Sequence, residues 1–178
     1  MIKSARGFTL LELFFTMVIV VILAGLAVPP FTHLIKSFRS QDLYNNVFSL
    51  IQYARSKAAF SGEDVLLCPS IDTIHCNKDW ENTLIIFVDN NKNRIRDHHE
   101  VIDRSISLLK NNEKIIWRAF GSNRYIRFVS DGSTEYQNGN LTICPADKNI
   151  DLMQRIIVYK SGRARKAQQK EIKLEHCH

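Results

Sequence analysis

Positive charge is concentrated near the C-terminus of this 178-residue chain, whose formal net charge is +6. Residues 160–173 contain six basic side chains and a single acid, Glu171. The six are Lys160, Arg163, Arg165, Lys166, Lys170 and Lys173. Cations gathered on one segment attract phosphates and other anions. The other interpretation of such a segment is an ordinary solvated tail.

The spacing of the two arginines favours phosphate binding. Arg163 and Arg165 alternate around Ala164, so a continuous strand would project both side chains from one face, at a spacing that suits adjacent phosphates. Lys160, Lys166 and Lys170 would strengthen the field electrostatically.

An acid near the other end of the chain needs an explanation of a different kind. The 21 residues from Phe8 to Val28 are almost all apolar, and as a helix they would span roughly 30 Å, the thickness of a hydrocarbon core. Glu12 interrupts this run, and an acid inside a membrane is costly unless it has a partner. A new α-amine, made by cutting between Gly7 and Phe8, would supply one. A secretory signal cleaved after the apolar run, near residues 24–27, is the alternative.

The stretch Gly7-Phe8-Thr9-Leu10-Leu11-Glu12 resembles the cleavage and methylation motif of type IV prepilins and type II secretion pseudopilins. The resemblance implies that a prepilin peptidase cuts after Gly7 and methylates Phe8. It also implies that Glu12 pairs with the terminal amine of a neighbouring subunit during assembly. The implied partners are other major and minor pilins, the peptidase and an inner-membrane assembly platform. The implied location is the inner membrane, with the head in the periplasm, and then the pilus at the cell surface.

The helical pattern continues beyond the apolar run. Pro29-Pro30 predicts a kink near Val28, after which apolar residues recur at intervals of three and four up to Ala58. Ser61-Gly62 should end this amphipathic helix. We therefore expect a leader at residues 1–7, a transmembrane and assembly helix at 8–30, an amphipathic helix at 31–62 and a β-rich head at 63–178.

Short runs of strand-forming residues, separated by turn clusters such as Asp131-Gly132 and Asn138-Gly139, follow Glu63. The expected strands are 65–68, 83–88, 114–117, 125–128, 141–144 and 155–159. The predicted fold class is α+β, with a long kinked N-terminal helix packed on an antiparallel β-sheet head.

The chain has four cysteines, and an even number in an exported protein favours disulfides over metal binding. Cys68 and Cys76 flank a short loop that contains Pro69, which indicates a bridged turn. This leaves Cys144 to pair with Cys177, although three connectivities are possible. The second bridge would tether the C-terminal segment.

Catalytic and metal sites are not predicted. The sequence contains no nucleophile elbow, phosphate loop or carboxylate pair, so we expect neither enzymatic activity nor a cofactor. Residues 89–93 resemble the start of a calcium loop, but Arg94 and Arg96 stand where the turn glycine and further oxygen ligands belong, which favours a polar turn. The histidines of residues 97–100 and 176–178 lack the spacing of a closed tetrahedral site.

Several head segments resemble FimT/GspH-like minor pilins. They are 87–91, 126–128 before Asp131-Gly132, 141–144 and a terminal strand that closes with Gly162-Arg163-Ala164-Arg165. The last resembles the motif through which FimT-like pilins of competent bacteria bind DNA, which implies that Gly162, Arg163 and Arg165 take part in binding. We expect a minor type IV pilin that binds double-stranded DNA for natural transformation. The alternatives are a minor pilin that only primes pilus assembly and a type II secretion pseudopilin.

Overall fold

The computed structural model describes residues 7–110 and 112–177, with the backbone alone for residues 26–30. The chain divides into two units, with the boundary between Phe38 and Arg39. Apart from Gly7, the expected leader lies outside the described residues, as do Asn111 and His178. Each unit is described separately below.

The first unit is mainly the first part of helix α1, which runs from Leu10 to Ser61. Thr9 caps the helix: its hydroxyl accepts a hydrogen bond from the Glu12 backbone N–H (3.3 Å), and its carbonyl accepts one from that of Leu13 (3.1 Å). The side chains from Leu10 to Leu23 are exposed. Among the described residues, no helix has the length and hydropathy of a membrane span. The span expected at 8–30 stays a prediction, as does the kink, although the helix continues through Pro29 and Pro30.

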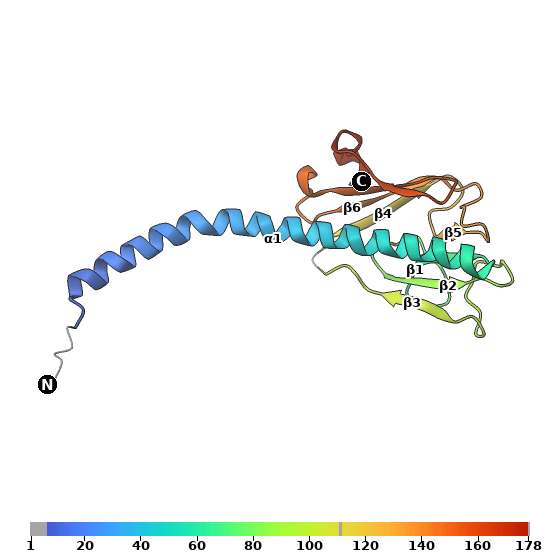
Figure 1. Ribbon diagram of the computed structural model, residues 1–178, viewed down its shortest axis with the longest axis horizontal. Helices are drawn as coiled ribbons and strands as arrows, with labels where there is room; N and C mark the ends of the chain where they lie inside the picture. Colours follow the sequence, from blue (N-terminus) through green and yellow to red (C-terminus); the bar gives the residue numbers. More distant parts are fainter. Residues whose placement is uncertain (1–6, 111, 178) are drawn as a thin grey trace. The chain divides into compact units, whose positions relative to one another are not determined.

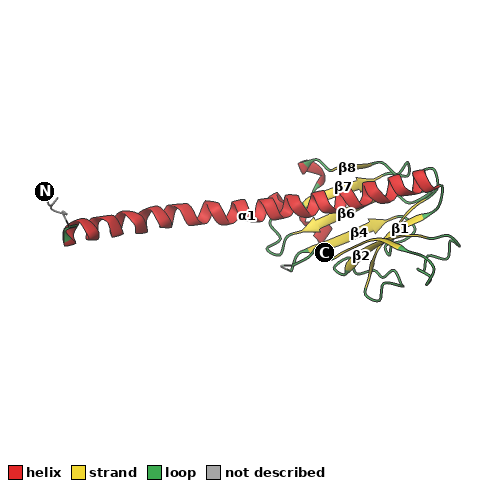
Figure 2. Cartoon of the chain, turned by 60° about the horizontal axis from the view of Figure 1, so that its bottom comes forward, coloured by secondary structure: helices red, strands yellow, loops and turns green. Residues whose placement is uncertain are grey.

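The second unit begins with the rest of α1, which packs on two β-sheets (Figures 1 and 2). One side of this helical segment is buried at intervals of three and four residues, as the amphipathic pattern predicts. The buried side chains are Leu43, Tyr44, Val47, Leu50, Ile51, Ala54 and Ala58. The helix ends at Ser61, before Gly62, as expected.

Two four-stranded antiparallel sheets form the rest of this unit, where the sequence analysis expected one. The first sheet contains, in spatial order, β3 (Ile102–Ile106), β2 (Thr83–Val88), β1 (Val65–Ser70) and β5 (Ile126–Phe128). The second sheet contains β4 (Lys114–Ala119), β6 (Gly139–Cys144), β7 (Gln154–Val158) and β8 (Ala164–Lys166). Short 3-10 helices lie between β6 and β7, at Ile150–Leu152, and after β8, at Gln169–Glu171 and Leu174–Cys177.

All six expected strands are present, and β3 and β8 are additional. The expected terminal strand through Arg165 is wrong in one respect, because β7 ends at Val158 and the chain turns back to form β8. The strand β8 is only three residues long, and the turn before it has the charge and polarity that an extended tail would also have. The sequence pattern therefore did not separate the two strands.

The main core lies between α1 and the inner faces of both sheets. Alternate residues of the strands point into it, such as Leu67 of β1, Ile86 of β2, Leu141 of β6 and Ile156 of β7. Figure 2 shows the helix crossing in front of the strands of the second sheet.

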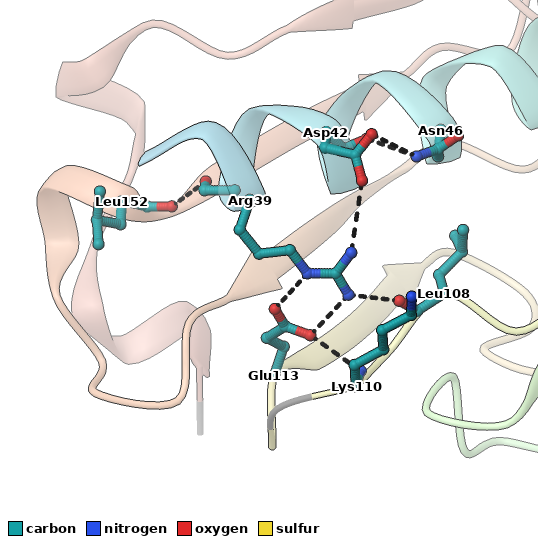
Figure 3. Close-up of polar contacts among 8 residues, drawn as sticks. Arg39, Asp42, Asn46, Leu108, Lys110, Glu113 and Leu152 are labelled. Carbon is teal, nitrogen blue, oxygen red and sulfur yellow. Dashed lines mark hydrogen bonds and ion pairs between the residues drawn. The ribbon is translucent and has the colours of Figure 1, made fainter. Parts of the chain in front are cut away.

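An arginine ties the beginning of the packed helical segment to the sheets (Figure 3). Arg39 donates to Glu113 from Nε (2.8 Å) and Nη2 (3.1 Å), and to the Leu108 carbonyl (2.6 Å). The hydrogen bond to Glu113 raises the pKa of Arg39. The neighbouring Ser40 hydroxyl donates to the Leu152 carbonyl (2.5 Å). These contacts fix where the helix meets the sheet edges.

The outer face of each sheet has its own buried cluster and its own disulfide. The cluster on the first sheet includes Cys68 and Cys76, which are joined. The cluster on the second sheet includes Cys144 and Cys177, also joined. Both predicted bridges are therefore present. The second disulfide holds the chain after β8, residues 167–177, which we call the C-terminal tail.

Candidate nucleic-acid interface

The basic segment folds as a β-hairpin followed by the C-terminal tail. Strands β7 and β8 are joined by a tight turn, in which the Gly162 N–H donates to the Tyr159 carbonyl (2.8 Å) and the Tyr159 N–H donates to that of Arg163 (3.0 Å). The Lys160 carbonyl accepts from the Thr134 N–H (2.9 Å). The turn is therefore held in place by its neighbours and is not a free end.

Gly162 is required at this turn for two reasons. Its φ of +72° lies in the left-handed region that favours glycine. A Cβ atom there would also lie within 1.9 Å of the Gly132 carbonyl oxygen in the neighbouring turn. Gly162 thus shapes the turn and offers no side chain to a ligand.

The guanidinium group of Arg165 is engaged within the chain. It makes a two-pronged ion pair with Glu171, with both N–O distances at 2.8 Å, and donates from Nε to the Tyr159 hydroxyl (2.7 Å). The ion pair raises the pKa of Arg165 and lowers that of Glu171 to about 2. Glu171 also accepts from the Gln168 N–H (2.7 Å). Arg165 therefore holds the tail against the hairpin.

The other predicted cations differ in how much they are engaged. Lys160 and Arg163 lie on the turn with exposed side chains, and within residues 7–110 and 112–177 these make no hydrogen bond or ion pair. Lys170 is exposed beside Glu171 and helps to lower the pKa of that acid. Lys166 lies on the opposite face of β8, with Nζ 4.8 Å from the Tyr44 ring centroid. The structure thus brings Lys160 and Arg163 together as exposed cations and directs Lys166 to the helix.

A second arginine fixes the tail from the strand beneath it. Arg155 of β7 donates from Nη1 to the Glu171 carbonyl (2.6 Å) and lies 3.1 Å from Nε2 of His176. Burial, with the nearby charge of Arg155, lowers the pKa of His176. With the Cys144–Cys177 disulfide, these contacts hold the tail at its middle and at its C-terminal end.

A groove of about 480 Å³ lies beside the hairpin, on the outer face of the second sheet. The sequence did not predict it, because its residues come from three strands and the loops next to them. The lining includes Arg118, Phe120, Asn138, Arg155, Ile157 and Tyr159. Burial lowers the pKa of Arg155, and the positive charge of Arg118 adds to the effect. Two cations and two aromatic rings therefore meet in one concave surface.

The loop that resembles a calcium site is ordered by its own hydrogen bonds. Buried Asp89 accepts from the backbone N–H groups of Asn93 (3.1 Å) and Arg94 (3.0 Å), and Arg94 adopts a φ of +66° at the place where a calcium loop would have its turn glycine. Ligand atoms of Asp97, His99 and Glu100 lie within 4.8 Å of one another. Both carboxylate oxygens of Glu100 already accept backbone N–H groups.

The described part of the predicted cleavage and assembly motif lies at the start of α1. Gly7 and Phe8 precede the helix, and Phe8 is 80% exposed. Glu12 is exposed in the first helical turn, where a carboxylate is favourable because of the helix dipole. The structure thus adds a local helix-stabilising role to the assembly role predicted for Glu12.

A long helix packed on antiparallel sheets, with its first turns exposed and apolar, is the architecture of the pilin-like proteins. Residues 44–162 match the family model described as type II transport protein GspH. The chain belongs to this family of minor pilins and pseudopilins. No curated protein matches the sequence.

Solved structures share this fold at low sequence identity. The type IV minor pilin FimU of Pseudomonas aeruginosa is 16% identical with a TM-score of 0.57, covering 75% of this chain and 91% of FimU. The minor pseudopilin EpsH of Vibrio cholerae is 13% identical with a TM-score of 0.52, covering 72% of this chain and 96% of EpsH. At these identities the likeness supports the fold.

Proposed function

We propose that this protein is a minor type IV pilin that binds extracellular double-stranded DNA, without sequence preference, for uptake in natural transformation. The single observation that supports the proposal most is the pair of exposed cations, Lys160 and Arg163, on the braced β7–β8 turn. The nearby acid, Glu171, is already neutralised by Arg165, so it does not compete for these cations. The proposed role is binding and assembly, without catalysis.

The roles that we propose for the predicted residues now differ from one another. Lys160, Arg163 and Lys170 contact phosphates, because their side chains are exposed. Gly162 sets the turn, and Arg165 positions the tail through Glu171. Lys166 contributes its charge from the side that faces the helix.

The proposal is tested by fluorescence anisotropy with a labelled duplex and the full chain. The chain is kept in a mild neutral detergent because α1 exposes apolar side chains. Binding should be weak, with Kd on the order of 10⁻⁴ to 10⁻⁶ M, and should weaken with salt. Lys160→Gln with Arg163→Gln should lower the log–log salt slope by about two, since each neutralised phosphate contributes about 0.9.

A matched control removes the same charge elsewhere. Lys78 and Lys148 are exposed and lie outside the hairpin, so Lys78→Gln with Lys148→Gln should change the slope little. An equal decrease of the salt slope in both double variants would show that DNA binding depends on net charge alone. If the variant with Lys160→Gln and Arg163→Gln binds DNA as tightly as the wild type, the proposed interface is wrong.

Processing and assembly form a second, separate part of the proposal. We propose cleavage after Gly7 by a prepilin peptidase, methylation of Phe8, and pairing of Glu12 with the terminal amine of a neighbouring pilin on the inner-membrane platform. Gly7→Ala should block removal of the leader, whereas Glu12→Ala should be cut but fail to enter filaments. Immunoblots of sheared pili distinguish the two, and uncut wild-type protein in filaments would contradict this assignment.

A pseudopilus subunit is the second candidate function. The family description and the structural likeness to EpsH favour it, because both refer to type II secretion. Deleting the gene should then block secretion of exported proteins and leave transformation intact. The opposite result supports the DNA-uptake proposal.

A further inference from the structure

The groove beside the hairpin has features that phosphate binding alone does not require. Phe120 is 69% exposed and Tyr159 is 40% exposed, and both line the groove. Large aromatic side chains seldom remain this exposed at a concave surface unless they contact something. The volume of about 480 Å³ lies within the range of sites that hold small ligands.

The charge of the groove indicates an anionic occupant. Arg118 and Arg155 line it, and no acidic side chain is among the described residues of the lining. The buried Nε of Arg155 has no hydrogen-bond partner. Partial burial of Arg155 disfavours its charged form, the positive charge of Arg118 adds to this effect, and an anion in the groove would relieve the cost.

Flat aromatic rings, cations and amide side chains together match the chemistry of a nucleotide. A base can stack on an exposed ring, and its phosphate can contact a guanidinium group. In duplex DNA the base faces are hidden by their neighbours, so only an unpaired nucleotide can use the rings. Asn138 and Asn140 also line the groove and offer hydrogen bonds to a base edge.

We propose that this groove accepts unpaired nucleotides, so that the protein binds single-stranded DNA more tightly than duplex DNA of similar length. The inference rests on the proposed DNA-binding function and adds a ligand preference to it. Phe120 is the principal stacking residue. Tyr159 is the secondary one, because its hydroxyl is already bonded to Arg165. The phosphates next to the stacked base lie toward Arg163 on the adjoining turn.

The test compares three labelled probes of 20 nucleotides or base pairs at one low salt concentration: oligothymidine, an abasic strand with the same number of phosphates, and a duplex. The full chain in neutral detergent should bind oligothymidine about tenfold more tightly than the abasic strand, because stacking favours each base by a comparable factor. Phe120→Ala should remove most of this difference. The affinity of the Phe120→Ala variant for the abasic strand and for the duplex should stay within about twofold of the wild-type value.

Two further variants separate stacking from misfolding. Phe60 is 94% exposed and lies outside the groove lining, so Phe60→Ala is the matched control and should leave all three affinities unchanged. Phe120→Trp should retain the preference for bases, because the larger ring also stacks.

The outcomes distinguish this inference from the function on which it rests. Equal binding of the abasic strand and oligothymidine, or equal weakening of both by Phe120→Ala, would overturn the stacking groove. Duplex binding that still depends on Lys160 and Arg163 would then leave the proposed function intact. Failure to bind any of the probes would overturn both.

Discussion

The outer faces of the two sheets are built alike, but the arginines on them pair with acids of different burial. Each face has a buried cluster, a disulfide and an arginine paired with carboxylates. On the first sheet, Arg127 of β5 pairs with buried Asp64 (2.6 Å) and with Glu135 (2.8 Å). On the second sheet, Arg165 pairs with half-exposed Glu171 (2.8 Å).

The difference shows that similar ion pairs serve different purposes on the two faces. Asp64 is 3% exposed, so its pair with Arg127 belongs to the packed structure. The Arg165–Glu171 pair lies at the surface, next to the exposed cations Lys160 and Arg163. The arginine of the first face is therefore neutralised by a buried acid, whereas that of the second face lies at the surface beside exposed cations and a groove.

The largest expected effect comes from breaking the buried pair. Asp64→Ala should lower the free energy of unfolding by about 3–5 kcal/mol, because it leaves Arg127 without its buried partner. Glu135→Ala removes the exposed partner of the same arginine and should cost under about 1 kcal/mol. Chemical denaturation measures both, and equal losses would contradict the assignment of the Arg127–Asp64 pair to the packed structure.

The disulfides should differ in the same measurement. Cys144 and Cys177 are 33 residues apart, whereas Cys68 and Cys76 are 8 apart. From the entropy of loop closure, alanine at Cys144 and Cys177 should lower the free energy of unfolding by about 4 kcal/mol, and alanine at Cys68 and Cys76 by about 2.5 kcal/mol. Only the loss of the Cys144–Cys177 bridge should weaken DNA binding, since only this bridge orders the tail. Weaker binding after removal of the shorter bridge would contradict the assignment of the interface.

A charge-neutral exchange sharpens the roles of the two hairpin arginines. Arg165→Gln with Glu171→Gln removes the surface pair without changing the net charge, so the salt slope of DNA binding should stay unchanged. Arg163→Gln alone should lower the slope by about one. A drop of one unit in the exchange variant would show that Arg165 contacts a phosphate itself.

The smallest expected effect is a pH dependence. The folded-state pKa of Glu171, about 2, lies below its ordinary value of 4.5. The ion pair therefore stabilises the tail above pH 4.5, and this contribution is lost as the pH falls toward 2. Carboxyl titration by NMR should show the low midpoint, which should rise toward 4.5 in Arg165→Gln. A low midpoint that persists in this variant would assign the shift to the Gln168 N–H.

The sequence predicted the elements that depend on local patterns. Short runs of strand-forming residues predicted β1, β2 and β6, and the four cysteines allowed the two pairings that the structure contains. The edge strand β3 was missed because Asp103, Arg104 and Ser105 make its middle polar. Asp103 pairs with Lys57 (3.0 Å), and Arg104 lies over the Tyr53 ring, so this strand is held by side chains of the helix.

The candidate site was harder to predict because it depends on which strands are neighbours. The basic residues were visible in the sequence, but the pairing of Arg165 with Glu171 requires the bend of the tail. The groove requires β4, β6 and β7 to lie side by side, with Arg118 opposite Asn140 and Asn140 opposite Ile157. The apolar pattern of a strand indicates which face each residue takes, but it does not indicate which strands are neighbours.

The glycine contact under the hairpin has a mechanical consequence. Gly162 abuts the Gly132 carbonyl, and the same carbonyl accepts a hydrogen bond from Arg55 Nε of α1 (3.2 Å). A ligand that pulls on the β7–β8 turn would also load the neighbouring turn, because the Lys160 carbonyl accepts the Thr134 N–H (2.9 Å), and through that turn the load would reach Arg55 of the helix.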